Sequence, residues 1–485
     1  MGRIGLFRVT SSVCNLNWRY PIGIASALFV LFGAANVDAG EIDSKKYGYL
    51  SENLNLPPLD LNLPPLELAQ MRPNQTQNQP PPAGEEEADE DEQLEGETVL
   101  TRVREELDPL GVTVGSYLLF PKITIDETYT TNVFFVENNK SEELITTVKP
   151  EFVLNSDWNN HAVNLTADMT LGRHVRFTRE NYEDYHGAVD GRFDVVIDEH
   201  FIFGDLEYFR LHEGRASPDN TVGEAPTGYS QYQAIFQYFL RLNRLSFTVD
   251  STNTYFDYDD TPIAGAIGTN NDDRDRKEYR LAVKTGYEIF PDVEAFLRVS
   301  GNKISYVDQV DDDGFDRDSH GLEVVGGSEF DFGGTVFGSL FAGAAKQRYG
   351  DANLRNITTA IVGGNVDWNI TTLTTLNVNA NQSVQETTSG DASGFLSSNA
   401  GVRADHELLR NLLLSANLGV TQAKYKGIYR HEYTYQGGLG MKFMITRNFY
   451  TSANYGFTSK QSADGEGGDA DYKTHDVVLK LEMQL

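Results

Sequence analysis

The sequence has a single cysteine and no long apolar run after its N-terminal region. Cys14 precedes the apolar core of a candidate signal peptide, so the exported chain would contain no cysteine. It therefore offers neither a disulfide nor a lipid-attachment site. No later stretch supplies the roughly 20 consecutive apolar residues that a membrane-spanning helix needs. Any insertion into a membrane must use β-strands.

Basic residues are also scarce. The 485 residues include 40 Lys and Arg against 71 Asp and Glu, which gives a formal net charge of −31. Binding to nucleic acid needs clustered Lys and Arg to meet the phosphates. The sequence has no basic stripe, so we expect no nucleic-acid partner.

Catalytic and metal-binding motifs are missing. The nucleophile elbow and the phosphate-binding loop motif do not occur. His406 and Glu407 begin a zinc-protease pattern, but Arg410 stands where the second histidine is needed. Gln309 and His320 occupy calcium-loop positions that require Asp and Glu. We expect no cofactor, no metal site and no enzyme, although a catalytic triad is spatial and sequence order does not reveal it.

The N-terminus has the pattern of a secretory signal. Arg3, Arg8 and Arg19 precede the apolar run 22–32, and Val37-Asp38-Ala39 supplies small residues before a cleavage point. This order of charged, apolar and small residues predicts a signal peptide over 1–39. An uncleaved N-terminal anchor is the alternative, but the apolar run is short for a span.

Residues 40–104 have the composition of a linker. Two tandem heptapeptides, 55–61 and 62–68, each contain Leu-Pro-Pro-Leu, and the acidic run 85–92 follows three prolines. Dense proline and charge of one sign predict a disordered, extended periplasmic segment. It acts either as a spacer or as a docking segment for a periplasmic partner.

From residue 105 the pattern changes to alternating polar and apolar residues. In 161–172, Val163 and Leu165 share one face with further apolar residues, and Asn164 and Asp168 lie on the other. Such period-2 alternation is typical of β-strands with one polar and one apolar face. The last residues, 477–485, repeat it up to the C-terminus.

Short and long connections alternate between the predicted strands. Short turns occur at 242–244, 291–292 and 446–448, whereas 257–277 and 459–471 are long and polar. Tight periplasmic turns and long external loops are typical of outer-membrane barrels. We predict an all-β fold over 105–485, an antiparallel transmembrane up-and-down β-barrel of about 18 strands between Ile123 and Leu485.

Several segments resemble a known family. They are 105–134, which leads into the first strand, 317–349, 368–376 and 406–412. These segments resemble the BBP2 family of bacterial outer-membrane β-barrel porins, and the resemblance extends over about 105–485. It implies an outer-membrane location and, since some members are linked to exopolysaccharide secretion, a periplasmic export partner. The family has no catalytic motif, so no functional residue is carried over.

Three functions follow as hypotheses. The first is a conduit for exopolysaccharide export, the second a general or small-solute diffusion porin, and the third a non-transporting surface or adhesin barrel. In each case the expected partners are outer-membrane lipid, lipopolysaccharide and the barrel-assembly machinery.

Charged residues within the predicted strands are candidates for the inner wall of the barrel. An Arg or Lys that faces lipid at mid-depth costs about 2–4 kcal/mol, so these side chains should point into the lumen. The candidates are Lys149, Glu151, Asp168, Arg280, Lys284, Glu288, Arg298, Arg403, Asp405, Lys480 and Glu482. Both signs occur, so no ion selectivity follows. The charges either contact a cargo or pair across neighbouring strands and stiffen the wall.

Overall fold

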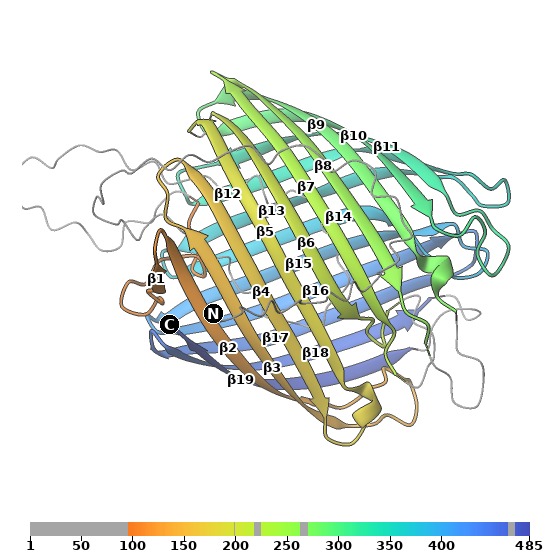
Figure 1. The fold of residues 1–485 in the computed structure, drawn as a ribbon, viewed down its shortest axis with the longest axis horizontal. Coiled ribbons are helices and arrows are strands. Elements are labelled where there is room, and N and C mark those ends of the chain that lie inside the picture. Colours follow the sequence, from red (N-terminus) through yellow and green to blue (C-terminus); the bar gives the residue numbers. More distant parts are fainter. Residues whose placement is uncertain (1–95, 198, 218–224, 262–269, 464–470) are drawn as a thin grey trace, which may run out of the picture. The chain divides into compact units, whose positions relative to one another are not determined.

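The computed structural model describes residues 96–197, 199–217, 225–261, 270–463 and 471–485. The predicted signal peptide, 1–39, and the predicted linker up to residue 95 lie outside the described residues. Within the described part, 18 antiparallel strands close into a barrel, as predicted, and one short additional strand precedes them (Figure 1). No helix in these ranges is long and apolar enough to cross a membrane.

The strands follow one another around the barrel in chain order. They are β1 (Val112–Val114), β2 (Tyr117–Thr130), β3 (Glu143–Ser156), β4 (His161–His174), β5 (Tyr182–Val196), β6 (His200–His212), β7 (Gly228–Leu242), β8 (Leu245–Tyr258), β9 (Arg276–Phe290), β10 (Val293–Tyr306), β11 (Ser319–Asp331), β12 (Val336–Tyr349), β13 (Ile357–Thr371), β14 (Thr374–Gln385), β15 (Gly394–Leu409), β16 (Leu412–Lys426), β17 (His431–Thr446), β18 (Phe449–Ser462) and β19 (Tyr472–Gln484). Two short 3-10 helices, η3 (Thr178–Glu180) and η4 (Asp272–Arg274), lie in loops.

The barrel closes between its last and first long strands. β19 pairs with β2 from Asp476 opposite Thr130 to Gln484 opposite Lys122. β1 pairs with the remaining part of the same edge, with Val114 opposite Tyr117. The first barrel strand thus begins at Tyr117, six residues before the predicted start at Ile123, because β1 and β19 share the edge of β2.

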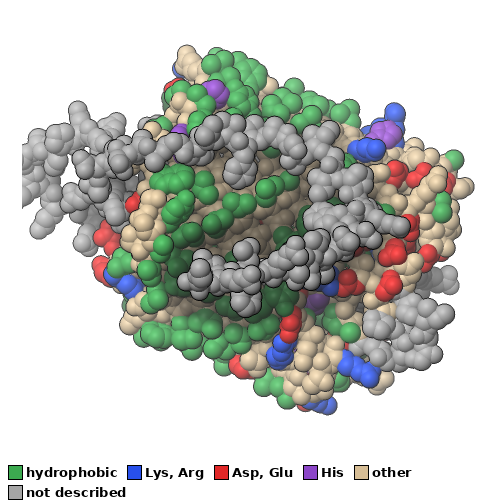
Figure 2. Space-filling view, viewed as in Figure 1, with side chains coloured by type: hydrophobic (Ala, Val, Ile, Leu, Met, Phe, Trp, Pro, Cys, Tyr) green, Lys and Arg blue, Asp and Glu red, His purple; other side chains and the backbone are tan. Residues whose placement is uncertain are grey.

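The two faces of the wall differ in chemistry. Outward positions carry large apolar side chains that are exposed in the isolated chain, such as Leu206, Leu418 and Leu439. Apolar side chains also cover much of the visible outer wall in Figure 2. Their inward neighbours along each strand are mostly polar, since successive residues point to opposite faces. An apolar outer band around a polar interior suits a barrel surrounded by lipid.

The two ends of the barrel also differ. At the turn end, short connections join consecutive strands, and Asn243 and Asp292 adopt positive φ angles of 57° and 61° in two of them. The chain enters β2 and leaves β19 at this same end (Figure 1). The loop end carries the long connections, such as 131–142 and 307–318, and acidic side chains gather there in Figure 2. This alternation matches the sequence prediction.

Candidate functional site: the lumen and its two ends

The inward faces of the strands enclose a cavity of about 1090 Å³. Its lining comes from nearly all of the barrel strands and includes Arg280, Arg298 and Lys480. These belong to the predicted lumen-facing set. Among the described residues, no group of three or more His, Cys, Asp or Glu is placed to hold a metal ion.

One group of charges connects β3, β4 and β5. The ammonium nitrogen of Lys149 lies 3.6 Å from a carboxylate oxygen of Glu151 and 3.7 Å from one of Asp168. Asp168 also lies 2.7 Å from Nδ1 of His186 on the next strand. Lys122 of β2 extends the chain of contacts, because its Nζ is 3.0 Å from Glu151. Three predicted site residues are therefore brought together in one network.

A second group lies on β9, β10 and β11. Arg298 and Arg280 both approach Glu323, at 3.2 Å and 3.9 Å. Lys284 lies 2.6 Å from Glu329. Arg298 is only 6% exposed and its Nε has no hydrogen-bond partner. Two guanidinium groups thus share one carboxylate on the inner wall.

The remaining predicted site residues are also paired. Glu288 lies 3.8 Å from Arg241, and Arg403 lies 3.0 Å from Asp405. Lys480 is 4.0 Å from Asp126, and Glu482 is 3.5 Å from Lys442. Each predicted residue therefore has an oppositely charged partner within ion-pair distance. This arrangement favours a stiffening role, and contact with a cargo stays a prediction.

Residues 96–108, which we call the inlet segment, lie at the turn end of the barrel, where Val99 and Arg104 are buried against the inner wall. Val99 is completely buried against Leu413, Met444 and Tyr450, all of which are inward residues of the wall. The prediction of a disordered linker up to residue 104 is therefore wrong for its last nine residues. The physical reason is the apolar contact of Val99, which is available only after the distant strands β16, β17 and β18 have come together.

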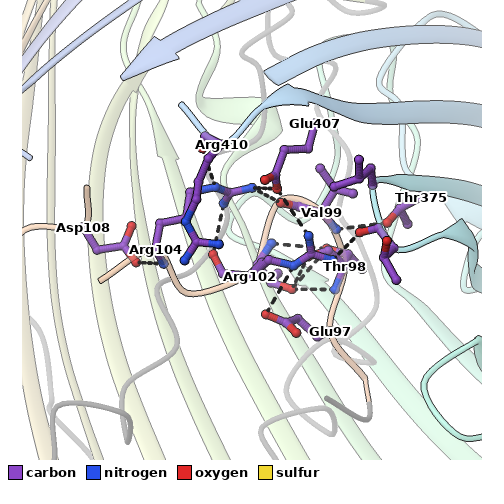
Figure 3. Close-up of polar contacts among 12 residues, drawn as sticks. Glu97, Thr98, Val99, Arg102, Arg104, Asp108, Thr375, Glu407 and Arg410 are labelled. Carbon is purple, nitrogen blue, oxygen red and sulfur yellow. Dashed lines mark hydrogen bonds and ion pairs between the residues drawn. The ribbon is translucent and has the colours of Figure 1, made fainter. Parts of the chain in front are cut away.

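An ion pair fixes the inlet segment to β15. Arg104 is 3% exposed, and its NH2 donates to Oε2 of Glu407 at 2.7 Å and to the carbonyl oxygen of Val99 at 2.8 Å. Arg102 approaches the same carboxylate at 3.3 Å. Figure 3 shows both guanidinium groups directed toward Glu407. A buried carboxylate between two arginines holds the segment in one position.

Further hydrogen bonds join the inlet segment to the wall. Oγ1 of Thr375 accepts from the backbone N–H of Val99 at 2.9 Å (Figure 3). Asn369 donates to the carbonyl of Glu97 at 2.7 Å. The Tyr450 hydroxyl donates to the carbonyl of Leu107 at 2.6 Å. The polar backbone of the segment is thus satisfied inside the barrel, as a buried chain requires.

Sequence reasoning missed the role of Glu407. It identified this residue only as part of an incomplete zinc-protease pattern, whereas the structure places its carboxylate between two arginines some 300 positions earlier in the chain. The nearest signal in the sequence is the pair Arg102 and Arg104, which follows the acidic run closely. Nothing in their spacing identifies the carboxylate they contact.

At the loop end, the first three residues of the connection 386–393 between β14 and β15 line the cavity. Arg317, which is 2% exposed, donates to the carbonyl oxygens of Thr387, Gly390 and Ala392. Asp311 forms an ion pair with Arg317. This aspartate belongs to the segment that resembles a calcium loop, and in the structure it orients an arginine.

Glu386 begins this loop and is half-buried. The hydroxyls of Tyr306 and Tyr349 donate to its two carboxylate oxygens at 3.3 Å and 3.5 Å. Burial, together with the negative charge of Glu278, raises the pKa of Glu386 to about 8, although Arg276 acts in the opposite direction. Glu386 therefore changes charge near neutral pH at the lumen surface.

Comparison with solved structures finds matches of low sequence identity. OccK1 (OpdK) of Pseudomonas aeruginosa is 11% identical, with 76% of this chain and 99% of that chain covered and a TM-score of 0.41. OccK3 (OpdO) of the same organism is 10% identical, with 76% and 96% covered and a TM-score of 0.42. OccK2 (OpdF), solved in complex with glucuronate, is 9% identical, with 76% and 98% covered and a TM-score of 0.42.

Comparison with curated proteins finds no match. The family described as "Putative beta-barrel porin 2" matches residues 105–485. This range contains all the strands of the barrel and the end of the inlet segment. The chain therefore belongs to this beta-barrel porin family, and it is an outer-membrane protein of the porin type.

Proposed function

We propose that this protein is a channel for small polar solutes across the outer membrane. The observation that carries the proposal is the cavity of about 1090 Å³ enclosed by the barrel wall, whose lining includes polar side chains such as Arg280, Lys480 and Gln436. The inlet segment lies against the inner wall at the turn end, and the first three residues of loop 386–393 line the cavity at the loop end. Both reduce the cross-section that a solute can use, which favours small cargo over large.

Exopolysaccharide export remains a finer hypothesis that rests on the family resemblance alone. The comparisons give it no support. A polysaccharide chain would also have to pass the inlet segment, which Glu407 holds by a buried ion pair. If export were the function, deletion of the gene would abolish secretion of the polysaccharide. Normal secretion in a strain without a second copy would reject export and leave the small-solute channel standing.

The channel is tested by electrical recording on the whole protein. The purified full chain, inserted into planar lipid bilayers, should give steady ion conductance. A variant lacking residues 96–108 should conduct more, because the inlet segment no longer occupies the turn end. A shift in gel mobility on heating serves as the control that both samples are folded barrels. Folded protein without conductance would overturn the proposal and favour a surface or adhesin role.

We extend the proposal to export of the protein itself. The segment 1–39 has the composition of a cleavable secretory signal, and the barrel-assembly machinery would insert the strands. N-terminal sequencing of the mature protein tests the cleavage after Ala39. A mature chain that retains residues 1–39 would reject it.

A further inference from the structure

The inner wall from β13 to β18 differs from the rest of the lumen. Its inward positions near the middle of the strands carry carboxamide side chains, which we call the amide band. The band consists of Asn365, Asn377, Asn379, Asn381, Asn399, Asn417, Gln436 and Asn454. Asn365 lies opposite Asn379, and Asn381 lies opposite Asn399. Threonines continue the band, because Asn399 lies opposite Thr421 and Thr421 opposite Thr434.

Glycines on the neighbouring strands make room for these amides. A Cβ atom added to Gly401 would lie 3.0 Å from Oδ1 of Asn379. One added to Gly438 would lie 2.5 Å from Oδ1 of Asn417. Both distances are shorter than ordinary carbon–oxygen contacts, so the amides lie against the glycine backbone. The band therefore lies close to the backbone of the wall.

The band faces the cavity and has unused hydrogen-bonding capacity. Asn381, Gln436 and Asn454 line the cavity. The Oδ1 atoms of Asn399 and Asn454 are buried without a hydrogen-bond partner. A buried acceptor without a partner costs about 1–3 kcal/mol, so rotation of these carboxamides toward the lumen, where they could accept from a solute hydroxyl, would be favoured.

Amides that do have partners hydrogen-bond to one another and to the carboxylate of Asp367, which accepts from Asn365 at 3.1 Å and from Asn377 at 2.9 Å. Nδ2 of Asn377 donates to Oδ1 of Asn365 at 2.8 Å, and Nδ2 of Asn379 donates to Oδ1 of Asn377 at 3.2 Å. Each carboxamide has two N–H donors and an acceptor oxygen, so such a chain leaves donors and lone pairs for a ligand. A hydroxyl group also donates and accepts, and a row of hydroxyls therefore matches a row of amides.

The charged parts of the wall are less available to a charged solute. Lys149, Arg280 and Lys284 already have carboxylate partners. A charged solute would have to compete with these ion pairs, whereas a neutral hydroxylated solute meets amide groups that are partly unpaired. The ion pairs of the charged wall therefore favour a neutral ligand at the amide band.

We propose that the amide band is a binding site for small neutral polyhydroxylated solutes, meaning sugars and polyols, on their way through the lumen. This inference rests on the proposed channel and specifies its substrate class. Passing solutes would exchange hydrogen bonds from one row of amides to the next. The band would thereby favour neutral sugars over uncharged solutes of the same size that lack hydroxyl rows.

The test is current block in planar bilayers by a neutral trisaccharide, maltotriose, added to the full-length channel. Maltotriose should interrupt the current, and polyethylene glycol of similar mass should interrupt it much less. In the double variant Asn399→Leu and Asn454→Leu, the apparent Kd for maltotriose should rise about tenfold or more, since two hydrogen-bonding groups are lost. The matched control is Gln233→Leu, which removes a carboxamide from the cavity lining on β7 and should leave the Kd unchanged.

Each other outcome has a defined meaning. If the channel conducts but maltotriose and polyethylene glycol block equally, or if Gln233→Leu weakens block as much as the double variant, the amide-band site is rejected and the channel stands. Block by gluconate but not by maltotriose also rejects it, in favour of the charged walls. A folded chain that does not conduct rejects the proposed function itself. Asn454→Ala, which removes the carboxamide from a cavity-lining position and should also raise the Kd, replaces the double variant if that variant shows no heat-dependent gel shift.

Discussion

At the scale of single residues, one carboxylate, that of Glu407, contacts both arginines of the inlet segment. Arg104 and Glu407 are 3% and 6% exposed, so solvent screens their attraction little. A hydrogen bond to a charged group contributes about 1.5–3 kcal/mol. Arg104 also donates to the carbonyls of Arg102 and Val99, which would partly compensate for the loss of Glu407.

We expect Glu407→Gln to weaken docking of the inlet segment by about 2 kcal/mol, which corresponds to about a 30-fold larger undocked fraction. Trypsin cleavage after Arg102 and Arg104 should accelerate accordingly in native protein, and this rate is the measurement. Glu106→Gln is the control, because Glu106 forms an exposed pair with Arg410. Equal cleavage rates in the two variants would show that the buried pair does not hold the segment.

The raised pKa of Glu386 predicts that the stability of loop 386–393 depends on pH. Its pKa is about 8 in the folded chain against an ordinary 4.5, because it is half-buried and faces Glu278. The folded loop therefore binds the proton more tightly than the unfolded loop does. The resulting stabilisation is complete below pH 4.5 and is lost as the pH rises through about 8. Tyr306, Tyr349, Arg276 and Arg317 face the same carboxyl group.

Amide hydrogen exchange in loop 386–393 measures this effect. After correction for the intrinsic rate, exchange should accelerate between about pH 5 and about pH 8 in the natural protein. In Glu386→Gln, the corrected rate should be independent of pH over this interval. A pH dependence that survives this substitution would assign the titration to another group.

At the scale of secondary-structure elements, alternation decides which residues face lipid. Leu418 of β16 is 69% exposed in the isolated chain, whereas Thr421 on the same strand lines the lumen cavity. The wall therefore has an inner and an outer surface within a single strand. A one-residue change of register would exchange them.

This asymmetry predicts unequal effects of one substitution on the two faces. Leu418→Arg should lower the free energy of unfolding by about 2–4 kcal/mol, because it places a guanidinium group in hydrocarbon. Thr421→Arg points into the lumen and should cost much less. Urea unfolding in lipid vesicles, followed by tryptophan fluorescence, gives both values. Similar losses for the two variants would contradict the assignment of the faces.

At the scale of the whole molecule, an even number of strands determines where the chain ends lie. Among the described residues, β2 begins and β19 ends at the turn end, and the acidic loops gather at the other (Figures 1 and 2). The first barrel strand, β2, therefore begins at the turn end, which the inlet segment also occupies. The closed ladder from β2 to β19 does not depend on that segment, and this is why the deletion variant should still fold.

The sequence determined the barrel and its orientation. Period-2 alternation, as in 161–172, fixes which side chains face lipid, and the alternation of turns and loops fixes the two ends. Both are local patterns, so they are readable without the fold. The strand number was predicted for the same reason.

Tertiary structure alone decided the contents of the lumen. The contacts of Arg104 with Glu407 and of Arg317 with loop 386–393 join residues that are distant along the chain. The amide band likewise exists only after the register places Asn379 beside Gly401. Such pairs depend on which strands become neighbours across the barrel and in what register, and no local pattern records that partner.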